Sequence, residues 1–259
     1  MWWFTVLTPP LLYATWVHFL PLSTVWIDSK VHNALLCAYS AIAFTGVVVH
    51  WSLVQQLPSV CVPTSPMPLW LTTSWYISKF WEWGDTMLLV QRRKPVRRVH
   101  YVHHMITPSL VALQFVGRGH SQTPLFEMGT ALNAFVHVWM YAYFYNPSAW
   151  SPAWRSMITC LQVSQHVIMT TLIGATILMQ DENCMTDVSG NIVPFLVYCM
   201  FSVEFTYLLP SCVRDLVTGM SGMGGFFYLA LWSSSERVRG ISYAVREWHV
   251  IRMLRGHAK

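Results

Sequence analysis

The sequence predicts an all-α membrane protein, a single domain over residues 1–259 with about seven transmembrane helices. The chain is 54% hydrophobic and only 10% charged, whereas soluble domains carry about 25% charged residues. Its 15% aromatic content also excludes a disordered chain. Seven apolar stretches, each near the roughly 20 residues that one span requires, use up nearly all of the sequence.

Each predicted span is an apolar run, and most of the charged residues lie between these runs. Pro9, Pro10 and Pro21 interrupt the first run, so its helical pattern is the weakest of the seven. A further apolar run at 225–232 is too short to span and is predicted to lie at the membrane interface. The predicted spans cover residues 3–26, 33–54, 68–90, 99–117, 125–145, 153–179 and 192–213.

The distribution of Lys and Arg predicts the orientation of the helices. Residues 91–98 contain five of these cations and a basic tail at 233–259 contains six, whereas 55–67 contains none and 180–191 is acidic. With seven spans, every basic loop falls on one side. Because basic loops stay in the cytosol, the C-terminus is expected there and the N-terminus in the lumen. No nucleic-acid motif is seen, so no nucleic-acid partner is expected.

Ionisable residues lie inside two neighbouring spans, at 79–86 (KFWEWGDT) and at 100–104 (HYVHH). Such groups are costly in hydrocarbon, so they are rare there and usually mark function. At about 1.5 Å per residue, Glu82 lies about 12 Å from the cytosolic end of its span. His103, His137 and Gln162 lie in the same half of three other spans, which predicts that four polar clusters meet there.

Spacing predicts that each cluster turns one face inward. Residues three and four apart share a helix face. The predicted inward stripes are Lys79, Glu82 and Thr86; His100, His103 and His104; Asn133, His137 and Tyr141; and Gln162, Gln165 and His166. Pro108 adds a local effect, because its ring clashes with the carbonyl of residue 104 and leaves that acceptor free.

These ordered motifs resemble those of the ELO family, the very-long-chain fatty acid elongases. The family patterns are K-x-x-E-x-x-D-T, H-x-x-H-H, H-x-x-M-Y-x-Y-Y and T-x-x-Q-x-x-Q. They appear here at residues 79–86, 100–104, 137–144 and 159–165. The third departs from the pattern, with Phe144 in place of Tyr and Tyr145 next to it. The resemblance covers about residues 30–215.

The resemblance implies a condensing enzyme of the endoplasmic reticulum membrane. Such an enzyme joins malonyl-CoA to a long-chain acyl-CoA, releases CO2 and CoA, and leaves a 3-ketoacyl-CoA without a further cofactor. The implied fold has seven spans, of which six form a closed barrel around an acyl tunnel while the first lies outside. The implied partners are membrane lipids and the ketoacyl-CoA reductase, dehydratase and enoyl reductase of the elongation cycle; a homodimer stays open.

The resemblance assigns the nucleophile to His103, because an imidazole can itself become acylated. Direct attack by the malonyl carbanion is the alternative. Glu82, Asp85 or His100 is expected to orient the imidazoles and set their tautomers, and His137 to polarise a thioester carbonyl or stabilise the enolate. The predicted catalytic residues are His103, His137, His100, His104, Glu82 and Asp85.

Neutral and cationic side chains at or near the depth of the predicted catalytic residues are expected to bind the substrate. Gln162 and Gln165 suit the positioning of a carbonyl. The basic run at 92–98 would hold the CoA phosphates, unless it serves only topology and attraction to the lipid surface. The predicted substrate-binding residues are Lys79, Arg92, Arg93, Lys94, Arg97, Arg98, Asn133, Tyr141, Gln162 and Gln165.

Other interpretations stay open. The group of Lys79, Glu82 and Asp85 also fits an ion-pair network that only pins the helices. Membrane di-iron desaturases and hydroxylases carry H-x-x-H-H boxes too, but they need about eight His in several boxes, so no metal site is predicted. A seven-span transporter or receptor is the non-enzymatic alternative. The remaining His are expected to be structural or solvated, with no partner at useful spacing: His18, His32, His50, His120, His249 and His257.

Cysteine placement predicts one disulfide, between Cys61 and Cys184. Both fall in loops that the charge distribution assigns to the lumen, where oxidising conditions preserve disulfides. The other cysteines lie within or at the ends of spans and are expected to act as small apolar residues: Cys37, Cys160, Cys199 and Cys212.

Overall fold

The computed structural model describes residues 2–19, 27–54, 66–116, 124–179 and 188–207, and all regular structure within these ranges is helical. Its helices are α1 (Trp2–Phe19), α2 (Ser29–Val54), α3 (Leu69–Trp81), α4 (Trp83–Gln91), α5 (Arg98–Val116), α6 (Pro124–Tyr145), the short 3-10 helix η2 (Pro147–Ala149), α7 (Pro152–Leu178) and α8 (Val188–Thr206). Each predicted span therefore corresponds to a helix, with α3 and α4 sharing the third. Residues 225–232 and 233–259 lie outside the described ranges.

The distribution of side chains on α2 suits a membrane. Its buried face carries His32, Asn33, Ser40 and His50. Its outer face is apolar, with 47–78% of each side chain exposed at Val31, Leu35, Ile42, Val49 and Leu53. A contiguous exposed apolar face of this kind is unusual in a soluble monomer. Among the described residues, two helices are long and apolar enough to cross a membrane, α2 and the Ala153–Leu178 part of α7.

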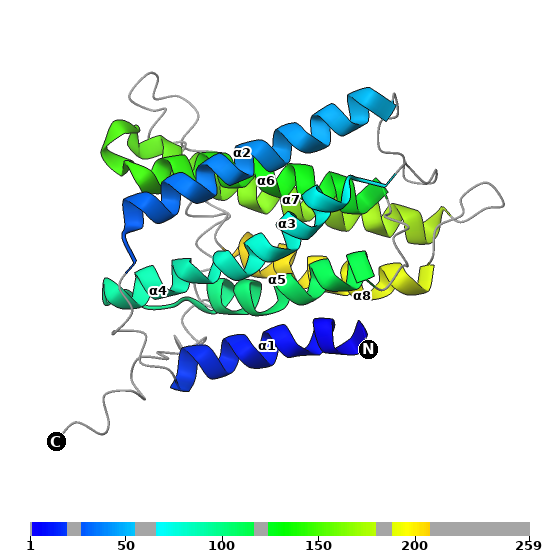
Figure 1. Cartoon of the computed structure of the whole chain (residues 1–259), viewed down its shortest axis with the longest axis horizontal. Coiled ribbons are helices and arrows are strands. Elements are labelled where there is room, and N and C mark those ends of the chain that lie inside the picture. Colours follow the sequence, from blue (N-terminus) through cyan, green and yellow to red (C-terminus); the bar gives the residue numbers. More distant parts are fainter. Residues whose placement is uncertain (1, 20–26, 55–65, 117–123, 180–187, 208–259) are drawn as a thin grey trace, which may run out of the picture.

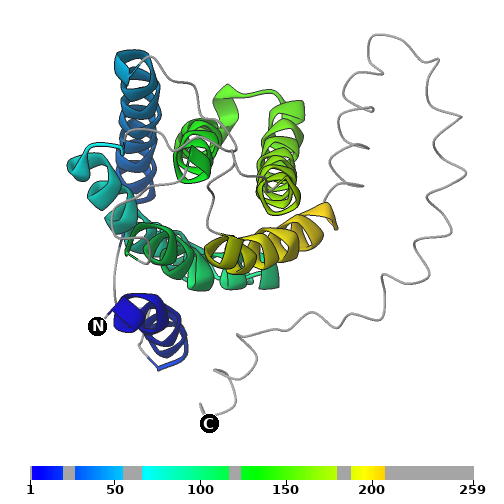
Figure 2. The same ribbon diagram turned by 90° about the vertical axis from the view of Figure 1, so that its right-hand side faces the viewer.

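The helices pack side by side, with α1 outside the others. Figure 2 views them end-on and shows α1 against the outer side of α5, while Figure 1 shows it running along one edge of the molecule. Among the other helices, α2 packs on α3 and α6, α7 on α6 and α8, and α5 on α3 and α8. Helices distant in sequence, such as α3 and α6, therefore lie in one group.

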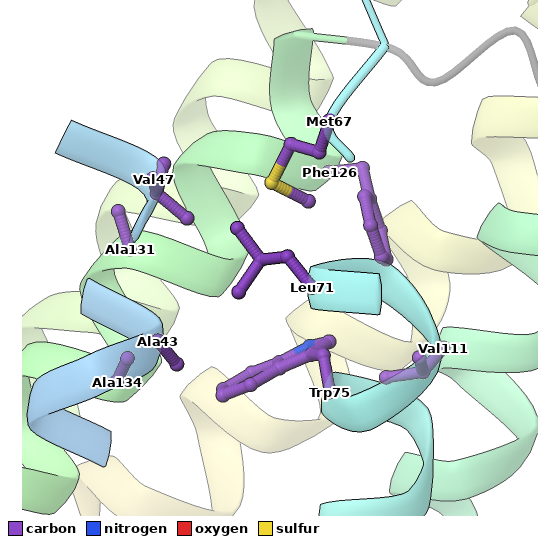
Figure 3. Close-up of a cluster of buried hydrophobic side chains, with 9 residues drawn as sticks. All are labelled: Ala43, Val47, Met67, Leu71, Trp75, Val111, Phe126, Ala131 and Ala134. Atoms are coloured by element: carbon purple, nitrogen blue, oxygen red, sulfur yellow. The ribbon is translucent and has the colours of Figure 1, made fainter. Parts of the chain in front are cut away.

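An apolar cluster joins α2, α3, α5 and α6 (Figure 3). Leu71 and Trp75 project from α3 into its centre, where small side chains on α2 and α6 allow close approach. The cluster comprises Ala43, Val47, Met67, Leu71, Trp75, Val111, Phe126, Ala131 and Ala134. Trp75 also lies beside Lys79, so this core positions the polar residues one turn further along α3.

The third predicted span is interrupted at Glu82, which separates α3 from α4. The Asp85 N–H bonds to the Glu82 carbonyl over 3.0 Å, a tighter turn than that of an α-helix. Gly84 follows in the first turn of α4. A Cβ atom there would lie 2.5 Å from Cε1 of His32, so only glycine allows α2 to approach this closely.

Candidate active site

Lys79 is the centre of a buried network between α3 and α6. Its ammonium donates to Glu82 Oε1 over 2.6 Å and to Asn133 Oδ1 over 3.0 Å, and it lies 3.7 Å from the centre of the Trp75 ring. Glu82 Oε1 is 3.4 Å from His137 Nδ1, and Asn133 Nδ2 is 3.3 Å from His137 Nε2. Four predicted site residues thus form one group in which the buried charges are paired.

Asp85 joins a second network, which contains a residue that the sequence analysis did not select. One carboxylate oxygen of Asp85 lies 2.8 Å from His32 Nε2, and the other accepts the Tyr141 hydroxyl over 2.8 Å. The expectation that His32 lacks a partner is therefore wrong. The carboxylate of Asp28 caps α2 by accepting the Lys30 and Val31 N–H groups. The helix thus begins ahead of the predicted span and turns His32 inward.

The three histidines of the box face in two directions. His100 Nε2 lies 2.9 Å from Thr86 Oγ1 on α4, and the His100 ring packs on the His104 ring with centroids 4.2 Å apart. His103 instead faces α7 and α8, with its ring centroid 5.8 Å from that of His166 and 4.9 Å from that of Phe201. The expected shared face therefore holds for His100 and His104, while His103 is directed elsewhere.

Pro108 has the predicted effect on the backbone. The helix continues through Pro108, and the carbonyl of His104, four residues earlier, accepts a hydrogen bond of 3.0 Å from Trp83 Nε1. An indole thus satisfies an acceptor that the missing proline N–H leaves free. This bond fixes α4 against α5 at the level of the box.

A pocket runs between the helices from His103 to Gln114. These positions are about 16 Å apart along α5. Polar side chains gather at the His103 end, and mostly apolar ones continue from there. The lining comprises Trp75, Lys79, His103, Thr107, Leu110, Val111, Gln114, Phe126, Gly129, Thr130, Leu132, Asn133, Gln165, His166, Met169, Tyr198 and Phe201.

Three buried polar atoms beside the pocket make no hydrogen bond: Nδ1 of His103, Oε1 of Gln165 and Nδ1 of His166. Buried polar groups in proteins are generally paired. An unpaired nitrogen or oxygen beside a pocket is available to a bound molecule. His103 and Gln165, both predicted site residues, therefore line one pocket, together with His166, which contacts each of them.

Other predicted binding residues lie away from this pocket. Gln162 donates to Met140 Sδ over 3.3 Å, so its amide is directed toward α6. The five basic side chains at 92–98 are exposed on the turn between α4 and α5, and Arg98 pairs with Glu204 on α8 over 3.1 Å. They precede His100 directly and thus lie at the end of α5 where the box is found.

Two further expectations need correction. His50 Nε2 lies 3.6 Å from Glu127 Oε1, and the other carboxylate oxygen of Glu127 accepts a bond from Trp51 Nε1. His50 is therefore paired across α2 and α6.

Cys160 is disulfide-bonded and does not act as a small apolar residue, whereas Cys37 and Cys199 are free thiols. Cys61, Cys184 and Cys212 lie outside the described residues. Within the described part of the chain, no group of three or more His, Cys, Asp or Glu is arranged to hold a metal ion.

Comparison with known proteins identifies similar sequences. The model of the ELO family, described as GNS1/SUR4 family, matches residues 17–209. A candidate fatty acid elongase of Dictyostelium discoideum is 28% identical over 208 residues, which cover 74% of this chain and 68% of the relative.

Two further relatives match over shorter segments. Fatty acid elongase A of the same organism is 30% identical over 53% of this chain and 51% of its own length. Very long chain fatty acid elongase 7 of Rattus norvegicus is 34% identical over 53% of this chain and 48% of its own length. The chain thus spans about half the length of these two relatives.

Proposed function

The chain belongs to the ELO family, and on that premise we propose that it is a fatty acid elongase acting as a 3-oxoacyl-CoA synthase. In this proposal it transfers an acyl group from a long-chain acyl-CoA to a malonyl-derived carbon and yields 3-ketoacyl-CoA, CO2 and CoA. Similarity to fatty acid elongases of two organisms supports the class of reaction. The whole reaction and its substrates are proposals for this chain.

The pocket beside His103 is the observation that carries the proposal. Its polar end holds an imidazole nitrogen of His103 without a hydrogen-bond partner, and such a nitrogen can attack a thioester. Its long, mostly apolar continuation suits an acyl chain. Packing of α2, α3, α5, α8, α7 and α6 on one another in turn supports a ring of six helices around this space. We propose that seven spans cross the membrane, the third formed by α3 and α4 together, and that the ring encloses an acyl tunnel.

The proposed reaction has two steps, beginning with acylation of His103. A ring nitrogen of His103 attacks the thioester carbonyl; an N–C bond forms, the C–S bond breaks, and CoA leaves with the imidazole proton. In the second step malonyl-CoA loses CO2, and the electron pair of the broken bond attacks the acyl carbon. The N–acyl bond then breaks and His103 takes up a proton. Direct attack of the malonyl carbanion on acyl-CoA remains the competing mechanism.

The paired residues would support these steps. Lys79 and Asn133 line the pocket and are held there by bonds to each other and, for Asn133, to His137. Their donors would thus be preorganised near the place where negative charge develops on an enolate or thioester oxygen. The Glu82 carboxylate fixes both Lys79 and His137. The exposed basic turn at 92–98 would hold CoA phosphates at the entrance.

We also propose a location in the endoplasmic reticulum membrane, with the basic loops and the C-terminus in the cytosol. This orientation rests on the distribution of Lys and Arg. The reductase, dehydratase and second reductase that complete an elongation cycle would then receive the product on the same side.

The decisive experiment supplies the purified protein with labelled malonyl-CoA and a panel of acyl-CoAs, and identifies the products by mass spectrometry. A labelled 3-ketoacyl-CoA, with release of labelled CO2, supports the proposal. Desaturated or hydroxylated products together with stoichiometric iron would instead favour an oxygen-dependent enzyme. Absence of any product with every acyl-CoA tested would contradict a condensing function.

A further inference from the structure

We propose that Tyr13, on the helix outside the group, is a positioning residue that acts through Thr86 to fix the tautomer of His100. The hydrogen-bond chain itself does not depend on the proposed function. Its expected effect on condensation does rest on that function. Tyr13 lies before residues 17–209, the part that the family model matches. It lies likewise outside the four motifs identified in the sequence.

The contact is a chain of two hydrogen bonds. The Tyr13 hydroxyl lies 2.8 Å from Thr86 Oγ1, which lies 2.9 Å from His100 Nε2. Tyr13 and Thr86 are both 0% exposed, so no bulk water reaches their hydroxyl groups. The Thr86 hydroxyl has one proton to donate and bonds to both Tyr13 and His100. A buried hydroxyl generally donates its proton, so when Tyr13 donates to Thr86, His100 Nε2 is the acceptor left for the threonine proton among these contacts.

A phenol donates more readily than it accepts, which favours one direction along this chain. Tyr13 then donates to Thr86, and Thr86 donates to His100 Nε2. His100 is thereby held as the tautomer that carries its proton on Nδ1. Its ring packs on His104 at 4.2 Å, and the His104 ring contacts His103 at 5.6 Å. The orientation of His100 is thus passed to the histidine that we assign as nucleophile.

The surroundings of Tyr13 hold its hydroxyl in place. Its ring packs against Trp16 on its own helix, Trp83 on α4 and Tyr101 on α5, with centroids 5.1–6.0 Å apart. Helix α1 is also fixed independently, because Ser109 on α5 donates to the carbonyl of Val6. Removal of the Tyr13 hydroxyl can therefore be separated from detachment of α1.

The test compares Tyr13→Phe with Ser109→Ala. Tyr13→Phe keeps the ring but removes the hydroxyl, and it should lower kcat for condensation about tenfold, which corresponds to about 1.4 kcal/mol of activation free energy. The KM values for acyl-CoA and malonyl-CoA should not change, because Tyr13 does not line the pocket proposed to hold the acyl group. Ser109→Ala removes a different hydrogen bond of α1, the one to α5, and should leave kcat as in the wild type.

Two substitutions of Thr86, one that keeps the hydroxyl and one that removes it, test the relay further, and a double-mutant cycle with Tyr13 tests whether the two residues act together. Thr86→Ser keeps the relay and should retain most activity, whereas Thr86→Val should lose about as much as Tyr13→Phe. The double variant Tyr13→Phe with Thr86→Val should be no worse than either single variant, since both break one chain. Additive losses would overturn the relay, as would an equal loss in Ser109→Ala.

A spectroscopic readout separates this inference from the proposed function. The 15N ring shifts of His100 in histidine-labelled protein should report protonated Nδ1 in the wild type and a mixture of tautomers in Tyr13→Phe. This measurement needs no substrate, so it remains informative if the wild type forms no 3-ketoacyl-CoA. Identical His100 shifts in the two proteins would contradict the positioning role even where condensation is observed.

Discussion

Buried polar side chains in this protein divide into paired and unpaired ones. Lys79, Glu82 and Asp85 each have partners on another helix, because an unpaired charge in a low-dielectric interior is strongly unfavourable. His103 and Gln165 have atoms without partners, and both line the pocket. The paired residues therefore hold the helices in register, and the unpaired ones indicate where a bound molecule completes the structure.

His103→Ala is expected to abolish condensation while leaving insertion and folding intact, because the side chain faces a pocket and its Nδ1 has no hydrogen bond to lose. Incubation of the wild type with acyl-CoA alone should release CoA and add one acyl mass to the protein, as intact-protein mass spectrometry would detect. The exposed His18 provides the control, since His18→Ala should keep both properties. Normal turnover in His103→Ala would rule out an acyl-histidine.

Gly84→Ala is expected to destabilise the protein, although alanine usually stabilises a helix relative to glycine. The new Cβ would lie 2.5 Å from the His32 ring, which cannot move without losing its 2.8 Å bond to Asp85. Overpacking of this kind costs about 1–3 kcal/mol. The midpoint of thermal unfolding in detergent should fall.

Gly46→Ala is the matched control for that substitution. Its Cβ would lie 3.2 Å from Leu71 Cδ2, the end of a flexible side chain that can shift by a few tenths of an ångström. Its unfolding midpoint should stay close to that of the wild type. Equal midpoints for Gly84→Ala and the wild type would show that the contact between α2 and α4 adjusts freely.

At the scale of helices, apolar runs predicted where each helix lies, because hydrocarbon admits only segments whose backbone groups are bonded internally. Their ends were less predictable. Asp28 caps α2 ahead of the predicted start, which is why His32 was assigned outside the span. The interruption at Glu82 has no proline to reveal it, and it depends on contacts that α4 makes with α2 and α5.

The turn between α4 and α5 also shows local geometry that the sequence does not indicate. Arg93 has φ of 54°, a position where glycine is usual. The N–H of Arg93 bonds to the Val90 carbonyl and that of Lys94 to the Leu89 carbonyl, which ends α4 in a Schellman motif. This sharp end keeps the basic side chains together on one exposed turn.

Replacing the basic residues of this turn by Gln should raise the KM for acyl-CoA roughly tenfold, with a weaker salt dependence than the wild type. Phosphates are bound through charge attraction that salt screens. The substituted set is Arg92, Arg93, Lys94, Arg97 and Arg98, all exposed. Lys30 and Arg155 are exposed cations elsewhere, and their replacement by Gln should leave KM unchanged. An unchanged KM in the turn variant, with altered membrane orientation, would make the turn purely topological.

At the scale of the whole molecule, the sequence predicted which polar residues cluster. It did not predict which of them face the pocket and which face a neighbouring helix. Matching depth in the predicted spans brought Lys79, Asn133 and His137 together as expected. Rotation of each helix about its axis depends on packing that no single segment contains. For that reason Gln162 is directed toward Met140, whereas Gln165 faces the pocket.

The extent of the pocket predicts which side chain limits the acyl chain. Phe126 and Gln114 line the pocket far from His103, and Phe126 also belongs to the apolar cluster of α2, α3, α5 and α6 (Figure 3). If the acyl chain extends from His103 along α5, the Phe126 ring closes its path. Phe126→Leu should therefore lengthen the longest product by at least one elongation cycle, measured as the product distribution from one acyl-CoA in excess malonyl-CoA.

Two further variants make this prediction decisive. Phe126→Ala should extend the product further, but loss of a buried ring costs about 3–5 kcal/mol of stability, so the distribution of products rather than the rate is the relevant measurement. Phe135 lies on the same helix with 37% of its surface exposed, and Phe135→Leu should leave the products unchanged. If the space beyond His103 limits the acyl chain, both Phe126 variants must change the products; an unaltered distribution in both would mean that the acyl chain does not occupy this pocket.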